Sequence, residues 1–461
     1  MFQDLVETDS QQDAIPLWVT DDAGFAAWAE AQGEHARRWI EASDFKPKAG
    51  ELLLLPGADG QPAGAVLGVG KADRLGPWDL APASAKLPAG RYRLMAEGAS
   101  LGHSLVGWML AHYRFDRYKS EQNGSQPRIL VVPEGLPVKE SLRLAEAIAL
   151  VRDLVNTPAS DMGPEALAQA VRASVEPFGA KVREIVGDDL LEAGFPAVHA
   201  VGRASSQPPR LLDVTWGSES NPKLTLVGKG VTFDTGGLDI KPSSAMLLMK
   251  KDMGGAAHAL ALARLVMEAG LPVRLRLIIP AVENAVSGNS FRPGDILKTR
   301  KGISVEVGNT DAEGRLILCD ALALATEEQP DLLLDFATLT GAARVALGPE
   351  LPALFTPDDA LAADLARHGE AVSDPLWRLP LWEPYREMLN SPVADINNAG
   401  EGGFAGAITA ALFLQRFVPQ GTPWAHFDLY AWTNANRPAR PKGGEAMILR
   451  ACWALLASRY A

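Results

Sequence analysis

The stretch NTDAEGRL at residues 309–316 places two carboxylates and a guanidinium in one short polar segment. The apolar residues 303–307 just before it predict a β-strand, and the apolar run 316–325 just after it predicts a buried helix. The polar segment is therefore expected to be a tight loop between two rigid elements. We therefore take this loop as the centre of the predicted fold.

Two interpretations of the loop remain open from these residues alone. Asp311 and Glu313 alternate along the chain, so both can point to one side of an extended segment, and Gly314 lets the backbone pass close to a bound group. In the other interpretation, Asp311 is a helix cap and Glu313 interacts favourably with the helix dipole.

Upstream of the loop, helical patterns alternate with short apolar runs. Helices are predicted at 141–156, 164–175 and 255–270, and strands at 180–186, 211–216, 224–228 and 273–280. This alternation predicts an α/β fold in which a mixed, mostly parallel sheet is sandwiched between helices. Ligands of such sheets bind beyond the carboxyl ends of the strands, so the polar loops that follow the strands are the candidate site.

The length of 461 residues favours two domains. We predict an N-terminal α/β domain at 1–140, a candidate for an oligomerisation or regulatory role, and a catalytic domain at 141–461. The first region contains short strand candidates separated by Pro and Gly, with helices near 21–32 and 100–113. Its His103 and His112 have apolar neighbours and are interpreted as structural.

Composition limits the class of protein. The net charge of −12 disfavours a nucleic-acid binder, which needs a concentrated basic face. The two cysteines, Cys319 and Cys452, support neither a disulfide framework nor a thiolate metal site. The acidic start lacks the pattern of a secretory signal, and no apolar window is long enough for a membrane span. We expect a soluble cytoplasmic protein.

A second polar loop, GKGVTFDTGG at residues 228–237, follows the predicted strand 224–228 directly. It contains Lys229 in apolar surroundings, where a lysine is unusual unless it has a function. A nucleotide-binding G-x-G-x-x-G pattern fails, because Phe233 stands at the third glycine position. Farther on, Asp252 precedes the helix predicted at 255–270 and can equally be a cap of that helix.

If these loops converge, their charges require cations. Five side chains would then share one pocket: Lys229, Asp234, Asp252, Asp311 and Glu313. Carboxylates this close repel unless positive charge lies between them, and two divalent metals would balance four of them. Lys229 can be a ligand only as a neutral amine. Lys241 and Arg315 would be left to stabilise developing negative charge or a bound anion. The outline is that of a two-metal hydrolytic centre.

The motif strings also resemble a known family. They are NTDAEGRL at 309–316, VGKGVTFDTGG at 227–237, IKP at 240–242, KDMGGAA at 251–257, VRDLVNTPAS at 151–160, AGAITAALFLQRFV at 405–418 and WAHFD at 424–428. In these strings the chain resembles the leucine (cytosol) aminopeptidase family M17 of dinuclear metallopeptidases, over residues 140–461. Cys319 stands where the family most often has a small residue such as alanine. Asp239 and Met246 lie in a stretch that varies within the family.

The resemblance implies a role for each charged residue of the loops. Asp234 and Glu313 would bridge the two metals, Lys229 and Asp252 would complete the tightly held site, and Asp311 would bind the exchangeable ion. Zn or Mn is expected, with Mg and Co as alternatives.

It also implies the chemistry at the reacting carbonyl. Lys241 would polarise the scissile carbonyl while a metal-bridging hydroxide attacks it, and Arg315 would bind a bicarbonate that acts as general base. The free α-amine of the substrate would bind one metal, so the enzyme would release N-terminal residues, leucine and other apolar ones, from peptides.

The first side chain of the substrate would contact positions that match the family's pocket: Met249, Thr338 and Gly341, with backbone contacts near Leu339. Met249 and Thr338 can also be plain core residues. The Gly-rich loop 397–403 can edge the cleft, and His258 is interpreted as a core histidine.

The resemblance further implies a homohexamer that acts on peptides with a free N-terminus. Two other functions remain: a two-metal phosphoesterase, and a DNA-binding role in addition to catalysis, which the acidic composition disfavours.

Overall fold

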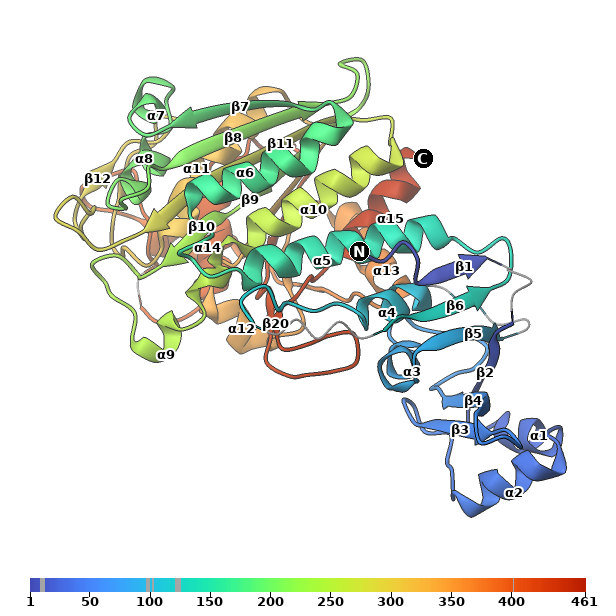
Figure 1. The fold of residues 1–461 in the computed structure, drawn as a ribbon. Coiled ribbons are helices and arrows are strands. Elements are labelled where there is room, and N and C mark those ends of the chain that lie inside the picture. Colours follow the sequence, from blue (N-terminus) through green and yellow to red (C-terminus); the bar gives the residue numbers. More distant parts are fainter. Residues whose placement is uncertain (9–12, 97–99, 102, 121–125, 401) are drawn as a thin grey trace. The chain divides into compact units, whose positions relative to one another are not determined.

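A computed structural model describes residues 1–8, 13–96, 100–101, 103–120, 126–400 and 402–461 (Figure 1). The chain forms two compact units, one of Met1–Ala149 with Asn434–Lys442 and one of Leu150–Thr433 with Gly443–Ala461. Among the described residues, no helix has both the length and the apolar character needed to cross a bilayer.

The first unit is built on a six-stranded sheet in the order β1-β6-β5-β2-β4-β3. Its strands are β1 (Val6–Thr8), β2 (Ile15–Thr20), β3 (Leu52–Pro56), β4 (Pro62–Gly68), β5 (Gly90–Met95) and β6 (Arg128–Val132). The pairs are parallel except for β3 with β4. Its helices are α1 (Phe25–Glu30), α2 (Glu34–Ala42), α3 (Ala81–Lys86) and α4 (Ser104–Leu110). The sequence missed β1, β2, α2 and α3.

The second unit is built on a larger mixed sheet in the order β16-β15-β18-β14-β9-β11-β8-β7, with β10 paired to β11. The strands are β7 (Lys181–Val186), β8 (Arg210–Trp216), β9 (Lys223–Gly228), β10 (Gly230–Asp234), β11 (Arg274–Asn284), β14 (Leu332–Ala337), β15 (Ala353–Phe355), β16 (Trp377–Arg378) and β18 (Trp424–Asp428). At its centre β18, β14, β9 and β11 are mutually parallel, as the sequence predicted.

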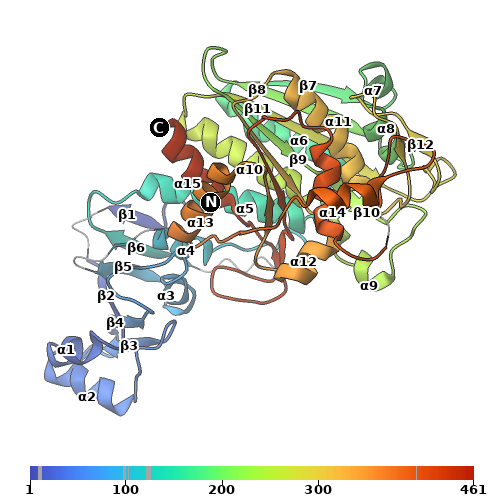
Figure 2. The same cartoon turned by 180° about the vertical axis from the view of Figure 1, so that it is seen from behind.

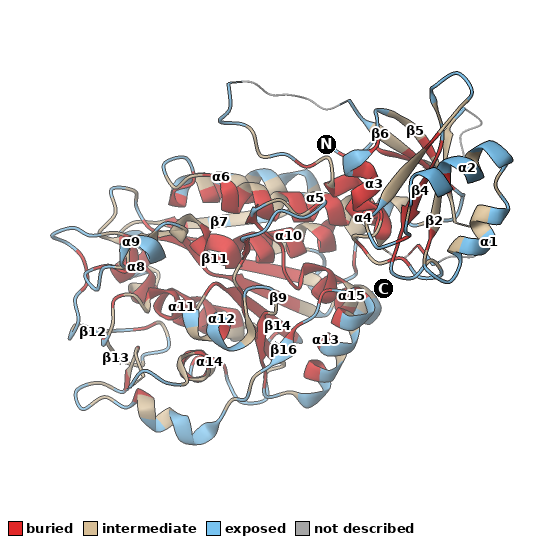
Figure 3. Ribbon diagram, turned by 90° about the horizontal axis from the view of Figure 1, so that it is seen from below, coloured by how far each residue is buried: buried red, intermediate tan, exposed pale blue. Residues whose placement is uncertain are grey.

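Helices cover both faces of this sheet. α6 (Pro164–Val175) and α10 (Gly254–Ala269) lie in front of it in Figure 1, and α11 (Glu313–Glu327) and α14 (Gly406–Gln415) lie in front of it in the reverse view of Figure 2. β9 and β14 are buried along nearly their whole length (Figure 3), because a sheet covered on both faces has no solvent side. The remaining helices are α5 (Val138–Asn156), α7 (Asp189–Glu192), α8 (Pro196–Gly202), α9 (Ser243–Met246), α12 (Gly341–Leu347), α13 (Asp359–Ala371) and α15 (Leu449–Tyr460).

The strand predicted at 303–307 is much shorter than expected. Only β13 (Val305–Glu306) forms, between β12 (Ile296–Leu297) and β17 (Ile396–Asn397). The helix after the polar loop starts earlier than predicted, because Glu313 is already the first residue of α11. β19 (Trp432–Thr433) and β20 (Gly443–Gly444) pair in a separate small sheet.

The parallel centre of the sheet determines where the polar loops meet. β9 ends at Gly228, β14 at Ala337 and β18 at Asp428. Because these strands are parallel, their carboxyl ends lie at the same edge of the sheet. Lys229 and Thr338 follow β9 and β14 at this edge, and Asp428 is the last residue of β18 there.

Candidate active site

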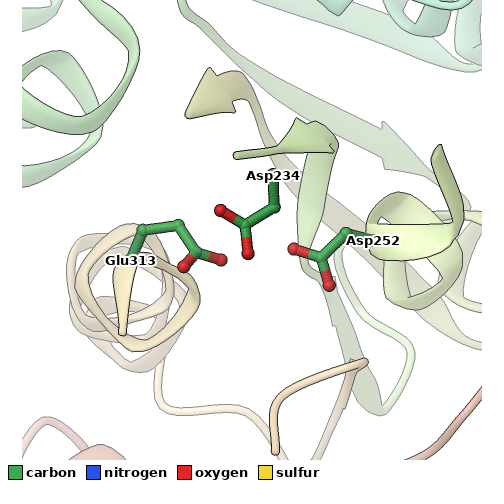
Figure 4. A group of neighbouring side chains, drawn as sticks. All are labelled: Asp234, Asp252 and Glu313. Carbon is green, nitrogen blue, oxygen red and sulfur yellow. The ribbon is translucent and has the colours of Figure 1, made fainter. Parts of the chain in front are cut away.

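Three buried carboxylates meet at this edge of the sheet. Asp234 ends β10, Asp252 lies in the short 3-10 helix η2 (Met249–Met253), and Glu313 starts α11. One oxygen from each lies within 4.8 Å of the others, and Figure 4 shows the three groups pointing toward one another. Such an arrangement can hold a metal ion.

Oxygens of this cluster lack hydrogen-bond donors. Within the described part of the chain, neither carboxylate oxygen of Glu313 nor Oδ2 of Asp252 accepts a hydrogen bond from a neutral donor, and Glu313 Oε1 and Asp252 Oδ2 are paired with the Lys229 ammonium instead. Burial raises the pKa of Glu313 well above its usual value, and the negative charge of Asp234 raises it further. Buried carboxylate oxygens that are not satisfied by donors fit a bound cation, because leaving them unpaired is costly.

Lys229 lies among these carboxylates. Its Nζ is 2.8 Å from Asp252 Oδ2 and 2.9 Å from Glu313 Oε1, and it donates a hydrogen bond to the carbonyl of Thr338. Burial opposes the charged form, but attraction to the carboxylates, Asp252 first, outweighs burial and raises the pKa of Lys229. A dication among the same carboxylates would cancel this attraction and favour the neutral amine.

Gly314 has a steric role beside Lys229. A Cβ at Gly314 would lie 2.4 Å from Cε of Lys229, so a larger residue would displace the lysine side chain. The group that passes close to the backbone at Gly314 is therefore Lys229.

Lys241 and Asp311 form the other side of the cluster. The Nζ of Lys241 lies 2.9 Å from Asp234 Oδ2 and is also ion-paired with Asp311. Burial would lower the pKa of Lys241, but Asp234 and the other carboxylates raise it above its usual value. Burial raises the pKa of Asp311 to about 6, with Asp234 adding to the shift and Lys241 opposing it.

The interpretation of Asp311 and Asp252 as helix caps is wrong, whereas Glu313 does lie in the first turn of α11, where a carboxylate interacts favourably with the helix dipole. Ala312 is the N-cap residue of α11 and Met253 that of α10, and neither helix has a side-chain cap. Asp311 precedes the cap position, and Asp252 instead accepts a hydrogen bond of 2.8 Å from the Thr338 hydroxyl. Contacts other than helix capping therefore fix the orientation of the Asp311 and Asp252 carboxylates.

The sequence missed the residues that orient this cluster. Asn284, fully buried at the end of β11, donates to Asp234 Oδ1 at 2.8 Å. The carboxylate of Asp239 accepts from the backbone N–H of Thr310 at 2.8 Å, although Asp239 had seemed to lie in a variable stretch. The only available signal for Asn284 was its position at the carboxyl end of a strand.

Asn398 holds the polar loop and Arg315 together. Its side chain accepts from the backbone of Gly308 at 2.8 Å and donates to the carbonyl of Asn309 at 2.8 Å. Its own carbonyl accepts from Nη1 of Arg315 at 2.6 Å. Burial lowers the pKa of Arg315 to about 10, and its Nε has no hydrogen-bond partner in the described part of the chain.

A cavity of about 330 Å³ opens beside the cluster. It is lined by Lys229, Asp234, Lys241, Asp252 and Asp311, and also by the predicted pocket residues Met249, Thr338, Leu339 and Gly341. Glu313 and Arg315 are buried beyond its lining. The carboxylate of Asp428 fixes the backbone of this part of the cavity, because it accepts a hydrogen bond from the backbone N–H of Leu339 at 3.0 Å.

The histidines take the structural places that the sequence indicated. His258 is fully buried in α10, with Nδ1 2.6 Å from the carbonyl of Gly254, and Nε2 accepts from the backbone of Met447 at 2.9 Å. In the first unit, Nε2 of His112 accepts from the backbone of Arg128 at 3.2 Å, and His103 precedes α4. Cys319 and Cys452 are free and buried.

Two family models match the chain. The cytosol aminopeptidase family, catalytic domain, matches residues 149–453, and the M17 aminopeptidase N-terminal domain matches residues 15–133. A probable cytosol aminopeptidase of Syntrophotalea carbinolica is 39% identical over 444 residues, which cover 89% of each chain. A protein of the same description from Roseiflexus castenholzii is 43% identical over 361 residues, covering 75% of this chain and 73% of that protein.

Solved structures agree with these matches. The cytosol aminopeptidase of Coxiella burnetii superposes with a TM-score of 0.94 at 47% identity and covers 99% of this chain and 100% of its own. The bottromycin maturation enzyme BotP in complex with Mn superposes with a TM-score of 0.86 at 34% identity, covering 96% of this chain and 99% of its own. With both domains matched and the acidic cluster in place, the chain belongs to the M17 cytosol aminopeptidase family, whose members are metal-dependent peptide hydrolases that act as aminopeptidases.

Proposed function

We propose that this aminopeptidase holds two divalent metal ions between the loops that follow β9, β10 and β13, and removes apolar N-terminal residues from peptides. The convergence of the buried carboxylates of Glu313, Asp252 and Asp234, with oxygens that have no neutral hydrogen-bond donor, carries this proposal. The proposed ligands are Lys229, Asp234, Asp252, Asp311 and Glu313. Metal ions bound there would supply Lewis-acid activation of water and of the scissile carbonyl.

Lys241 has the chemistry for the developing oxyanion. Its ammonium lines the cavity and is paired with Asp234 and Asp311 at the edge of the cluster. A fixed cation stabilises negative charge that appears only in the transition state, and so lowers the barrier. We assign to Lys241 the polarisation of the substrate carbonyl.

Arg315 is the proposed holder of a bicarbonate. Its Nε is buried without a hydrogen-bond partner in the described part of the chain, which suits a small oxyanion. By retaining this anion, Arg315 would keep a proton acceptor near the reacting water, a role for which the charged side chains of the cluster are less suited because they hold metals.

The apolar part of the cavity would accept the first side chain. Met249, Thr338 and Gly341 line it together with the backbone near Leu339, and Leu248 adds apolar surface. Apolar pockets discriminate weakly, by about 1–3 kcal/mol per methylene, so several apolar residues should be accepted.

Zn or Mn is the proposed metal, with Mg and Co as alternatives, because oxygen-rich sites bind several divalent ions and availability selects among them. The structure of BotP in complex with Mn supports Mn. We further propose a cytoplasmic homohexamer that acts on peptides with a free N-terminus. The net charge of −12 gives no support to a nucleic-acid partner or a membrane surface.

The test compares Leu-Gly with N-acetyl-Leu-Gly as substrates. Purified protein is stripped with chelator and then supplied with Mn or Zn, alongside the Asp311→Ala variant. We expect metal-dependent cleavage of Leu-Gly alone, because acetylation removes the amine that binds the site, and loss of this cleavage in Asp311→Ala.

Equal cleavage of the acetylated peptide would contradict the requirement for a free amine. No cleavage by folded, metal-loaded protein would contradict the proposed activity itself, and hydrolysis of a phosphoester under those conditions would favour the two-metal phosphoesterase.

A further inference from the structure

The wall of the cavity carries a pair of cations that the reaction does not use. The Nζ of Lys251 lies 5.0 Å from the ring centre of Tyr430, and Cζ of Arg344 lies 5.0 Å from the same centre. All three residues line the cavity. The ring face attracts both cations, but it carries no negative charge that could neutralise them. We refer to Lys251, Tyr430 and Arg344 as the cationic wall.

Lys251 is placed in an unusual way for a lysine. It is only 5% exposed, and among the described residues its ammonium makes no hydrogen bond or ion pair that would satisfy its charge. Lysine is rarely buried without a partner. A buried, uncompensated ammonium that lines an open cavity therefore indicates an anionic ligand that enters this cavity.

The carboxylates nearest to this wall are already engaged. Asp428 accepts hydrogen bonds from the backbone N–H of Leu339 at 3.0 Å and of Thr340 at 3.1 Å, and from the Thr340 hydroxyl at 2.6 Å. Asp252 accepts from Thr338 and contacts Lys229. The oxygens of both acids are thus bonded to other groups, and neither acid forms an ion pair with Lys251 or Arg344 among the described residues.

The cationic wall is interleaved with the pocket proposed for the first side chain. Lys251 follows Met249 by two residues in η2, and Arg344 follows Gly341 by one turn of α12. Nη2 of Arg344 lies 3.9 Å from where a Cβ at Gly341 would stand, so the guanidinium reaches back over the pocket. A group bound between Met249 and Gly341 would meet both cations.

We propose that the cationic wall binds a carboxylate of the substrate, and that this carboxylate is the side chain of an N-terminal glutamate or aspartate. The inference rests on the proposed function, because it places the first residue of a peptide in this pocket. The planar guanidinium of Arg344 suits a two-point contact with a carboxylate, and the Lys251 ammonium adds a point charge. The pocket would thus accept acidic as well as apolar first residues.

The C-terminal carboxylate of a dipeptide is a second source of the same chemistry. We favour the side chain, because Arg344 and Lys251 alternate with the residues assigned to the first side chain. The experiment below separates the two sources.

The test measures kcat/KM of metal-loaded protein for Glu-p-nitroanilide and for the uncharged, nearly isosteric Gln-p-nitroanilide. We expect the wild-type Glu:Gln ratio to fall about 10-fold or more in Arg344→Ala, the size expected for losing a hydrogen bond to a charged group. In Arg344→Glu the ratio should fall further, while the Lys:Leu ratio of the corresponding anilides rises. Arg367→Ala, an exposed arginine on α13, is the matched control and should leave the Glu:Gln ratio unchanged.

The second comparison uses Leu-Gly and Leu-Gly-amide. If Arg344→Ala lowers only the Leu-Gly to Leu-Gly-amide ratio, the wall binds the C-terminal carboxylate and the assignment to the side chain is overturned. If the protein cleaves leucyl substrates but neither ratio responds to the Arg344 variants, the proposal is overturned while the aminopeptidase function stands. If metal-loaded wild-type protein cleaves no substrate, the proposed function and this inference fail together.

Discussion

Glu313 and Asp320 are two fully buried carboxylates on the same helix, α11, and their surroundings differ in one respect. Asp320 accepts hydrogen bonds from the backbone of Ala197 at 2.9 Å, Val198 at 3.3 Å and Arg300 at 2.8 Å. Glu313 accepts none from a backbone or neutral side-chain donor within the described part of the chain, and its Oε1 is ion-paired with Lys229 at 2.9 Å. One carboxylate is satisfied by the fold, and the other is left for a cation.

The contrast shows which property of a buried charge indicates a site. Burial raises the pKa of both groups: that of Asp320 to about 6, with its backbone donors opposing the shift, and that of Glu313 well above its usual value. Burial alone therefore does not separate structural from functional acids. The presence of hydrogen-bond donors around the carboxylate separates the two kinds of acid, because a structural buried acid is normally hydrogen-bonded by the protein.

The largest expected effect follows from removing the unsatisfied acid. Glu313→Gln should lower kcat/KM for Leu-Gly by at least about 10⁴-fold, as for loss of a central catalytic group. In excess chelator its free energy of unfolding, measured by urea denaturation, should equal or exceed that of wild type, because a buried charge without neutral donors is gone and Lys229 keeps its ion pair with Asp252. A variant that keeps its activity would show that Glu313 is not a metal ligand.

The satisfied acid should behave in the opposite way. Asp320→Ala leaves three backbone N–H groups unpaired and should lower the free energy of unfolding by at least about 3 kcal/mol, at about 1–3 kcal/mol per orphaned group. The folded fraction should retain its metal-dependent activity, since Asp320 lies outside the cavity lining. Equal stability of the two proteins in urea would remove the contrast between the two acids.

The pH dependence of stability sharpens the same comparison. Folded Asp320 keeps its proton up to about pH 6, whereas in the unfolded chain it releases the proton near the ordinary aspartate pKa of 3.8. Between these values the folded state binds more protons, so the contribution of Asp320 to stability is largest below pH 4 and falls as the pH rises to 6.

The total change should reach up to about 3 kcal/mol, at about 1.4 kcal/mol per pKa unit. Urea denaturation of wild type and Asp320→Ala at pH 4 and pH 7 measures it: the stability difference between the two proteins should be larger at pH 4. A difference that grows toward pH 7 would mean that Asp320 is stabilised as an anion.

The smallest effect is expected from a residue that acts through the cluster. Asn284→Ala removes the donor to Asp234 Oδ1 and should weaken metal affinity or activity by about 10–100-fold, as for other groups that orient a ligand. Excess Mn should restore part of the activity of Asn284→Ala but none of the activity of Glu313→Gln. Full activity of Asn284→Ala at limiting Mn would show that Asp234 does not depend on this contact.

Local patterns were sufficient to predict the catalytic unit. Apolar runs and Gly punctuation located β8, β9 and α10 to within a few residues, and α6 as Pro164–Val175 without error. The convergence of Lys229, Asp252 and Glu313 was a hypothesis supported by the family resemblance, because Glu313 follows β13 of a separate small sheet and strand order alone does not bring it to Lys229. The sequence located these loops because each carries charge in apolar surroundings.

The supporting residues could not be predicted in this way. Asn284, Asn398 and Asp428 act through hydrogen bonds to residues 50 to 90 positions away in the chain, and no local pattern reveals such partners. In the first unit, β2 is only partly buried and α2 begins at Gly33 without a side-chain cap, so both signals were weak. Arg344 and Tyr430 were missed because their cation–π contact joins helix α12 to the segment after β18.

The most direct test of the account is a calorimetric titration of Mn²⁺ into chelator-stripped protein. We predict two binding sites per subunit in wild type and in Asp320→Ala, and loss of at least one of them in Glu313→Gln. Binding in Glu313→Gln that matches wild type, or no binding by wild type, would contradict the claim that the unsatisfied carboxylates hold the catalytic metals.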